Sequence, residues 1–151
     1  MALDITGIID AIVSHALASG YFERVNGHEP KSSPGSGLTA AVWVQNVRAV
    51  QSSGLAVSSA LLVFNVRLYT SMAQEPQDQI DPTLVQAVSA LFDAYAGDFE
   101  LGGLIRAVDL RGMEGTVLAA VAGYITQGGV TYRVITITLP VIVNDVWDEA
   151  A

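Results

Sequence analysis

Apolar residues near the N-terminus recur at helical spacing. Within residues 4–22 they stand three and four positions apart, at Ile5, Ile8, Ile9, Ile12, Val13, Ala16 and Leu17. This spacing places them along one stripe and predicts an amphipathic helix. Asp4 is the expected N-cap, and Gly20 is expected to end the helix.

A second helical pattern begins near the middle of the chain. Asp81 is predicted to be its N-cap, because Pro82 then takes the first helical position, where a missing N–H costs nothing. Its apolar stripe comprises Leu84, Val85, Val88, Leu91, Phe92 and Tyr95. Gly97 follows where a left-handed cap would end the helix. Residues 72–81, which precede it, are polar and aperiodic and are predicted to form a loop.

Two strands are predicted between these helices. Residues 38–50 are rich in strand formers, and residues 58–70 alternate with a period of two. One face of the second strand would carry Leu62, Phe64, Val66 and Leu68, and the other Val63, Asn65, Arg67 and Tyr69. The first of these faces is expected in the core. Residues 26–37, with two prolines and several polar residues, are predicted to be a surface loop.

The most informative pattern lies in residues 101–147. It indicates a short strand at 104–110, a turn, and a long hairpin of strands 116–126 and 130–143 joined through Gln127-Gly128-Gly129. Pro140 cannot donate to a ladder, which predicts an edge or bulge there. The run is apolar on both faces, whereas the helices can cover only one. We therefore expect a second copy of the protein to cover the other face.

The order of these elements predicts an α+β fold. Helix, two strands, helix and three strands indicate two amphipathic helices packed on a largely antiparallel β-sheet, with a long C-terminal β-hairpin. At 151 residues the chain has the length of a single domain, expected to cover 1–151.

Composition favours an assembly subunit over several other classes. Hydrophobic residues make up 51% of the chain and charged residues only 15%, so part of the apolar excess fits an interface. The net charge is -8, with six arginines and one lysine, which argues against tight binding of nucleic acid. No apolar run reaches the roughly 18 residues of a membrane span. The N-terminus lacks the basic flank of a secretory signal, so a cytoplasmic origin is expected.

No motif predicts catalysis or a cofactor. Cysteine is absent, which excludes disulfides and thiolate chemistry. His15 and His28 have no partner at metal-ligand spacing. Glu75, Asp78 and Asp81 lie three residues apart but lack the oxygen-ligand pattern of a calcium loop. The serines stand in no nucleophile motif. We therefore expect no catalytic, cofactor or metal site, and no enzyme.

Several charged and aromatic residues are candidates for contacts between subunits. Arginines in or beside strands either lay their stems along a solvated sheet face or pair with carboxylates of a neighbouring subunit. Trp147, expected in an acidic tail beyond the last strand, is a candidate interface anchor. The candidate oligomer or partner interface comprises Arg67, Glu75, Asp78, Arg106, Arg111, Tyr132, Arg133, Asp145 and Trp147.

Four segments carry a family resemblance. They are residues 59–69 with Phe64-Asn65-Val66-Arg67-Leu68-Tyr69, residues 75–82 with Glu75-Pro76-Gln77-Asp78, residues 97–103 with Gly97-Asp98-Phe99-Glu100, and residues 132–147 with Asn144-Asp145-Val146-Trp147. In their residue patterns and in their order along the chain they resemble tail terminator proteins of long-tailed bacteriophages, particularly those of actinobacterial hosts. The resemblance covers most of the chain from Ser58 onward and contains no catalytic signature.

Membership of this family would imply a structural role in the virion. The subunit would form a hexameric ring at the head-proximal end of the tail tube, halt polymerisation of the major tail tube protein, and offer a surface to head completion or connector proteins. DNA would pass through the lumen without specific binding. The protein would be assembled in the host cytoplasm and reside in the tail or neck of the virion, with no membrane partner.

Two alternatives stand beside this hypothesis. The chain could be another neck or tail component, such as a head-completion or tail-tube protein, and long filaments of this chain alone would favour a tube protein. It could also be a small-molecule-binding α+β domain with a pocket between helices and sheet. A large ligand-induced rise in melting temperature would favour that class.

Overall fold

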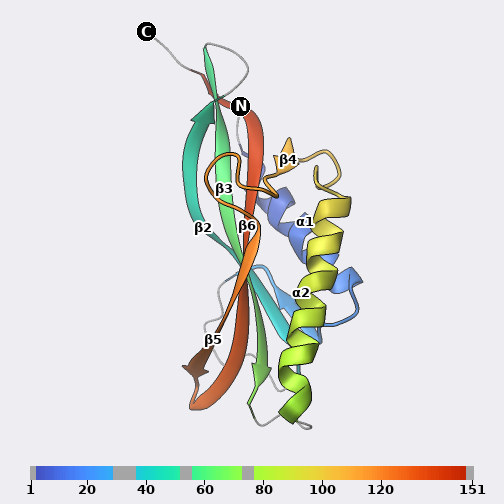
Figure 1. Ribbon diagram of the computed structural model, residues 1–151. Helices are drawn as coiled ribbons and strands as arrows, with labels where there is room; N and C mark the ends of the chain where they lie inside the picture. The colour runs from blue at the N-terminus through green and yellow to red at the C-terminus, as the bar shows by residue number, and fades with distance from the viewer. Residues whose placement is uncertain (1–2, 29–36, 52–55, 73–76, 149–151) are drawn as a thin grey trace.

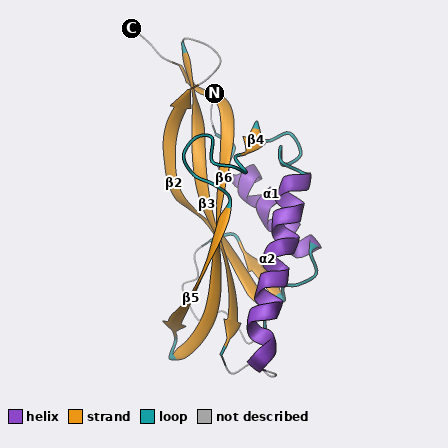
Figure 2. Ribbon diagram, in the orientation of Figure 1, coloured by secondary structure: helices purple, strands orange, loops and turns teal. Residues whose placement is uncertain are grey.

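The computed structural model describes residues 3–28, 37–51, 56–72 and 77–148. The elements are α1 (Ile5–Ala18), β1 (Arg24–Asn26), β2 (Thr39–Gln51), β3 (Val57–Ser71), the 3-10 turn η1 (Gln77–Gln79), α2 (Ile80–Gly97), β4 (Ala107–Val108), β5 (Ala119–Gln127) and β6 (Val130–Asp148). Both helices lie on one side of a sheet of long strands (Figures 1 and 2). The predicted α+β class is confirmed.

The sheet is organised around its last strand. The strand order is β1-β2-β3-β6-β4, and β5 also pairs with β6. Only β1 and β2 are parallel, so the sheet is largely antiparallel as predicted. β6 is 19 residues long and pairs with β3 on one side; on the other side it pairs first with β5 and then with β4. Within the described residues, neither helix has both the length and the apolar composition needed to cross a lipid bilayer.

The predicted ends of α1 are confirmed. The Asp4 carboxylate accepts a hydrogen bond from the Gly7 N–H at 3.0 Å, which caps the helix. The helix ends at Ala18, and Gly20 follows with a φ of 78°, a conformation that glycine adopts at little cost. The stripe buries Ile8, Ile12 and Ala16. Leu17, also placed in the stripe, is instead exposed.

The predicted caps of α2 are wrong. η1 leads directly into α2, so the helix begins at Ile80 with Gln79 as N-cap and no side-chain cap. Asp81 therefore lies inside the first turn, where its carboxylate is free to pair with another element. Gly97 is the last helical residue and does not take the left-handed conformation, which occurs later, beginning at Leu101.

The stripe of α2 is narrower than predicted. Its buried residues are Ile80, Leu84, Ala87, Leu91 and Tyr95. Val85 is 58% exposed, because each residue turns the helix by about 100° and the neighbour of Leu84 falls outside the buried stripe. Including Val85 in the core was therefore wrong.

The main core lies between the helices and one face of the sheet. The predicted inner face of β3, with Leu62, Phe64, Val66 and Leu68, is fully buried there, as expected. β6 contributes Ile135, Ile137, Leu139 and Val141 to the same core. The pattern of alternating side chains therefore identified the covered face of β3 correctly.

The opposite face of the sheet is also buried at two places along β6, on either side of the half-buried Thr136 and Thr138. Leu61, Val63 and Ile142 form one small cluster there, and Ala41, Tyr69, Tyr132 and Val134 form another. The chain connecting β4 to β5 lies over this face, where Arg48 of β2 donates to the Glu114 carbonyl at 2.8 Å and to the Thr116 hydroxyl at 3.2 Å. A single chain thus buries part of both faces of β6, which corrects the expectation that a second copy must cover the whole of the second face.

The end of β6 also differs from the prediction. The strand continues to Asp148, so Asp145 and Trp147 lie within it and not in a tail beyond it. The register with β3 shifts between Ser58 and Ala60, and Asp145 has a φ of 55° at this bulge. Its N–H donates to the Ser59 hydroxyl at 3.1 Å.

Pro140 lies in a gap between neighbouring strands. Its carbonyl accepts from the Asp109 N–H at 2.9 Å, so its main chain points toward the side occupied by β5 and β4. On that side β5 stops opposite Thr138 and β4 pairs with Val141 and Ile142. The missing N–H therefore interrupts no ladder, which is the edge-like position that the sequence predicts, without a bulge.

Other predicted boundaries shift by a few residues. The two-residue turn is confirmed, because Gly128 and Gly129 have φ values of 60° and 79° between paired Gln127 and Val130. β4 has only two residues of the predicted strand 104–110. Asn26, placed in the loop 26–37, ends β1, and residues 29–36 lie outside the described residues.

Candidate assembly interface

β5 is an open edge of the sheet. Among the described residues no strand pairs with its outer side. Its sequence, Ala-Ala-Val-Ala-Gly-Tyr-Ile-Thr-Gln, contains none of the charges or prolines that commonly protect such an edge. A nine-residue edge of this composition is suited to pairing with another strand.

The hydrogen-bonding groups that β5 presents outward can be assigned. The Thr131 carbonyl accepts from the Met72 N–H at 3.1 Å, so the Thr131 main chain points away from β5. Main-chain direction alternates along an antiparallel pair, so Tyr132 and every second residue after it bond to β5. Their partners on β5 are Ile125, Gly123, Val121 and Ala119, whose N–H and C=O groups face β6. The N–H and C=O groups of Ala120, Ala122, Tyr124 and Thr126 therefore face outward.

Apolar side chains flank this edge on both faces. Val121 is 71% exposed and Tyr124 is 63% exposed, on opposite faces of β5. Val117 and Met113, in the segment that precedes the strand, are exposed as well. Within the hairpin, the most exposed large apolar side chains are therefore those of Val121 and Tyr124 on β5, whereas Val130 and Trp147 of β6 are less exposed, at 38% each.

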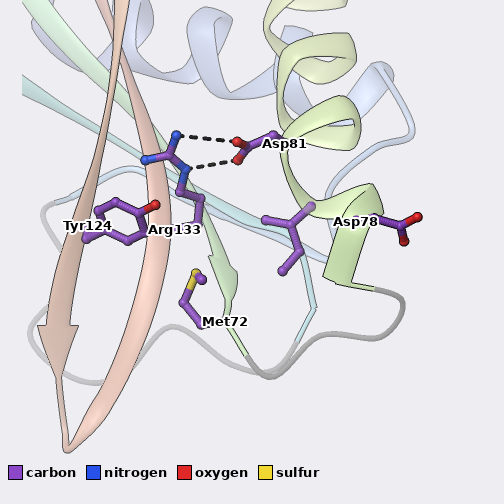
Figure 3. Close-up of a pocket in the computed structure, with 6 residues that line it drawn as sticks. Met72, Asp78, Asp81, Tyr124 and Arg133 are labelled. Atoms are coloured by element: carbon purple, nitrogen blue, oxygen red, sulfur yellow. Dashed lines mark hydrogen bonds and ion pairs between the residues drawn. The ribbon is translucent and has the colours of Figure 1, made fainter.

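One candidate arginine fastens the hairpin to α2. Arg133 Nε donates to Asp81 Oδ1 at 2.9 Å, and the guanidinium lies 4.5 Å from the centre of the Tyr124 ring (Figure 3). The hydrogen bond that Arg133 donates to Asp81 raises the pKa of Arg133. The arginine is thus engaged within its own chain, and its planar fork holds the hairpin against the first turn of the helix.

A cavity of about 260 Å³ surrounds this contact. Met72, Asp78, Ile80, Asp81, Tyr124 and Arg133 line it (Figure 3). It brings together two predicted interface residues, Asp78 and Arg133. Glu75, predicted beside them, lies outside the described residues. No group of three or more His, Asp or Glu side chains gathers for a metal ion within the described part of the chain.

Arg67 and Tyr132 are used in packing on the sheet face away from the helices. Arg67 Nε donates to the Thr136 hydroxyl at 2.8 Å, and its guanidinium lies 5.2 Å from the centre of the Trp43 ring. Tyr132 is 3% exposed and packs edge-on against Tyr69, with ring centres 6.3 Å apart. The Tyr132 side chain is therefore not presented at the surface of a single chain.

Arg106, Arg111, Asp145 and Trp147 remain available at the surface. All four are exposed, and both arginines line a second cavity, of about 380 Å³. Among the described residues, neither arginine side chain has a hydrogen-bond or ion-pair partner. These four residues keep the exposure that contact with another subunit requires.

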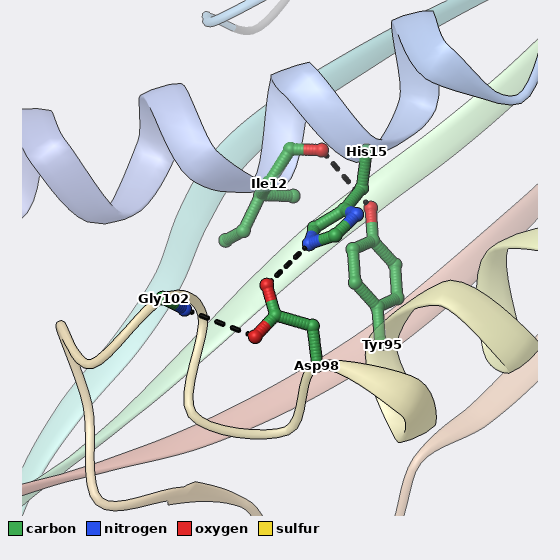
Figure 4. A network of polar contacts seen from close by, with 5 residues as sticks. All are labelled: Ile12, His15, Tyr95, Asp98 and Gly102. Carbon is green, nitrogen blue, oxygen red and sulfur yellow. Dashed lines mark hydrogen bonds and ion pairs between the residues drawn. The ribbon is translucent and has the colours of Figure 1, made fainter.

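Sequence reasoning missed a polar network that joins the two helices. His15 Nε2 lies 2.8 Å from Asp98 Oδ2, and the Gly102 N–H donates to Asp98 Oδ1 at 3.0 Å (Figure 4). The Tyr95 hydroxyl donates to the Ile12 carbonyl at 3.3 Å, and burial raises the pKa of Tyr95. His15 and Asp98 are 83 residues apart, so no local pattern signals their contact.

Comparisons with known proteins include a remote likeness to a solved structure. Neither a family model nor a curated protein matches the chain. Among solved structures, the chain is similar to a sheath/tube terminator of the extracellular contractile injection system PVC, solved by cryo-EM in the extended state, with a TM-score of 0.41 and 14% sequence identity. The match covers 100% of this chain and 61% of that one. The chain thus spans less than two thirds of the matched protein, and a likeness at this level does not define a family.

Proposed function

We propose that the protein is a non-enzymatic tail terminator, whose copies form a ring on the end of a phage tail tube. The ring stops polymerisation of the tube protein, and its other side binds head completion or connector proteins. The observation that carries the proposal is the open, uncharged edge of β5 with Val121 and Tyr124 exposed beside it. Residues 59–69, 75–82, 97–103 and 132–147 resemble tail terminator proteins, and this resemblance is the basis for proposing a ring with six-fold symmetry.

The sheet topology suits contact between identical neighbours. β1 pairs only with Thr39–Ala41 of β2, so within the described residues the outer edge of β2 from 42 to 51 is open. β2 and β5 lie at opposite ends of the sheet. A chain with two different open edges can join head to tail with its neighbours, and such heterologous contacts form a ring when the rotation between neighbours closes.

The charge of the chain suits a conduit for DNA. At -8, a ring of many copies would carry a strongly negative field, which does not retain phosphate backbones by counterion release.

The experiment compares two exposed valines. Val121→Lys places a charge beside the open edge of β5, and Val85→Lys places the same charge on the exposed side of α2. We expect wild type and Val85→Lys to form rings by light scattering and negative-stain microscopy, and to cap the ends of tubes of a tail tube protein. Val121→Lys should remain monomeric, with unchanged circular dichroism.

Each other outcome contradicts a defined part of the proposal. Rings of Val121→Lys as stable as wild type would exclude the β5 edge as the interface. Wild-type protein that stays monomeric and caps no tubes would exclude a tail terminator. Long filaments of this chain alone would identify a tube protein instead.

A further inference from the structure

The second cavity lies beside β4 and the loop that follows it. Its apolar wall is formed by Val108, Leu110, Met113 and Ile142, and its charged groups include Arg106 and Arg111. Its volume of about 380 Å³ falls within the roughly 300–1,000 Å³ typical of sites that enclose a small ligand or an anchoring side chain. Met113 is among the most exposed apolar residues of the described chain and stands open to a partner.

The loop that bounds the cavity is held in place by one buried carboxylate. Asp109 Oδ1 accepts from the Met113 N–H at 2.9 Å, and Oδ2 accepts from the Glu114 N–H at 2.8 Å. Gly115 N–H donates to the Gly112 carbonyl at 2.9 Å and closes the turn. The wall therefore exists before a partner arrives, which reduces the entropy cost of binding.

The charges at the cavity favour an acidic partner. Arg48, Arg67 and Arg133 each have a polar partner in the chain, whereas the side chains of Arg106 and Arg111 have none among the described residues. Glu114 also lines the cavity, and the Asp109 carboxylate is already bonded to the loop. Two unpaired arginines in a chain of net charge -8 are suited to carboxylates.

The end of β6 has the matching chemistry. Asp145, Trp147 and Asp148 are all exposed there, and Trp147 is 38% exposed. Neither carboxylate has an ion-pair partner among the described residues. An aromatic side chain flanked by acids can place its ring against an apolar wall while the carboxylates meet arginines at the rim.

The end of β6 does not fill the cavity of its own chain. Asp148 pairs with Val57 of β3, six positions along the strand from Ile142, which lines the cavity. A bulge takes up two residues of β6 in this stretch, because the β3 partners of the two positions, Leu61 and Val57, are only four residues apart. At about 3.3 Å per residue the two positions therefore lie roughly 13 Å apart. Asp148 is thus held away from the cavity wall of the same molecule, and among the described residues neither Asp145 nor Asp148 forms an ion pair with Arg106 or Arg111 of its own chain. Both acids are therefore available to another molecule.

We propose that this cavity binds the acidic end of β6 from a second copy of the protein. Trp147 of that copy contacts the apolar wall, and its Asp145 and Asp148 pair with Arg106 and Arg111. The inference rests on the proposed homo-oligomer and names a second contact in it, distinct from the β5 edge. Because cavity and strand end are different surfaces of one chain, the contact also joins neighbours head to tail.

The test uses the scarcity of lysine in the chain. Lys31 is the only lysine, so Arg111→Lys introduces one new amine that a carbodiimide can join to a nearby carboxylate. Equal amounts of ¹⁴N and ¹⁵N protein are mixed, unfolded, refolded together and cross-linked. We expect peptides that join position 111 to Asp145 or Asp148, with half of them pairing a light and a heavy chain. Arg24→Lys, at an exposed arginine of β1, should give no link to these acids.

A charge exchange provides a second readout. Arg111→Glu and Asp148→Arg should each weaken self-association on the order of fivefold, and the two together in one chain should restore it. Three outcomes would overturn the inference. They are cross-links found only within chains of one isotope, no cross-link at position 111, and self-association of the double variant that stays as weak as in the single variants. Rings that form equally well in every variant would also overturn it but leave the tail terminator proposal standing. Mixed-isotope links without tube capping would exclude the tail terminator and retain this contact.

Discussion

Single residues fasten α1 to the segment after α2. Asp98 accepts from the Gly102 N–H and pairs with His15, so one carboxylate joins the turn that follows α2 to the other helix (Figure 4). The hydrogen bond from Gly102, and then that from His15, lowers the pKa of Asp98. Because the side chain is 40% exposed, solvent screening keeps its contribution to stability small.

We expect Asp98→Asn to reduce stability at neutral pH and not in acid. A carboxylate with a lowered pKa in the folded state stabilises the fold above its unfolded pKa of about 3.9, and the effect is lost as pH falls through the folded value. Urea unfolding should show a loss of about 1 kcal/mol or less at pH 7 and no difference from wild type below the folded pKa. Asp10→Asn, at an exposed aspartate of α1, is the control. A deficit that persists unchanged in strong acid would contradict this account.

At the scale of elements, helix α2 separates buried from exposed positions within one residue. Leu84 is fully buried in the main core, whereas its neighbour Val85 faces solvent. Apolar composition alone does not distinguish them; the direction of each side chain from the helix does.

We expect Leu84→Ala to lower the free energy of unfolding by about 2–5 kcal/mol, because it leaves a cavity in a packed core. Val85→Ala should change it by roughly 0.5 kcal/mol or less. Urea unfolding followed by circular dichroism measures both changes. If the dependence of the free energy of unfolding on urea concentration is unchanged, the denatured state is the same in each variant. Equal losses of unfolding free energy for the two variants would mean that the buried stripe of α2 also includes Val85.

At the scale of the whole molecule, the net charge of -8 disfavours binding to DNA. Of the six arginines, Arg48, Arg67 and Arg133 are engaged in the chain, and Arg106 and Arg111 are those that we propose to pair with a second copy. Few cations remain to contact a phosphate backbone, and the chain as a whole is acidic.

We therefore expect no saturable binding to a labelled DNA duplex at micromolar protein, even at low salt where phosphate contacts are strongest. Fluorescence anisotropy measures this, with a basic DNA-binding protein on the same duplex as positive control. Binding that falls steeply as salt is raised would contradict the expectation and indicate a basic surface formed only on assembly.

The sequence by itself determined the local features. Asp4 and Gly20 mark the ends of α1, Gly128 and Gly129 form the hairpin turn, and alternation in β3 identifies its buried face. Each depends on the conformation of a few neighbouring residues or on a short period, so the chain itself contains the signal.

Only the tertiary structure decided which predicted residues meet and which stay open. It buries Tyr132 against Tyr69, joins Arg133 to Asp81, and leaves the outer edge of β5 without a strand among the described residues. It also brings β4 and its loop beside the far half of β6, where Arg106 and Arg111 share a cavity. These outcomes depend on strand order and on contacts between residues tens of positions apart. Local patterns do not specify them, because a strand presents the same alternation whichever neighbour it pairs with.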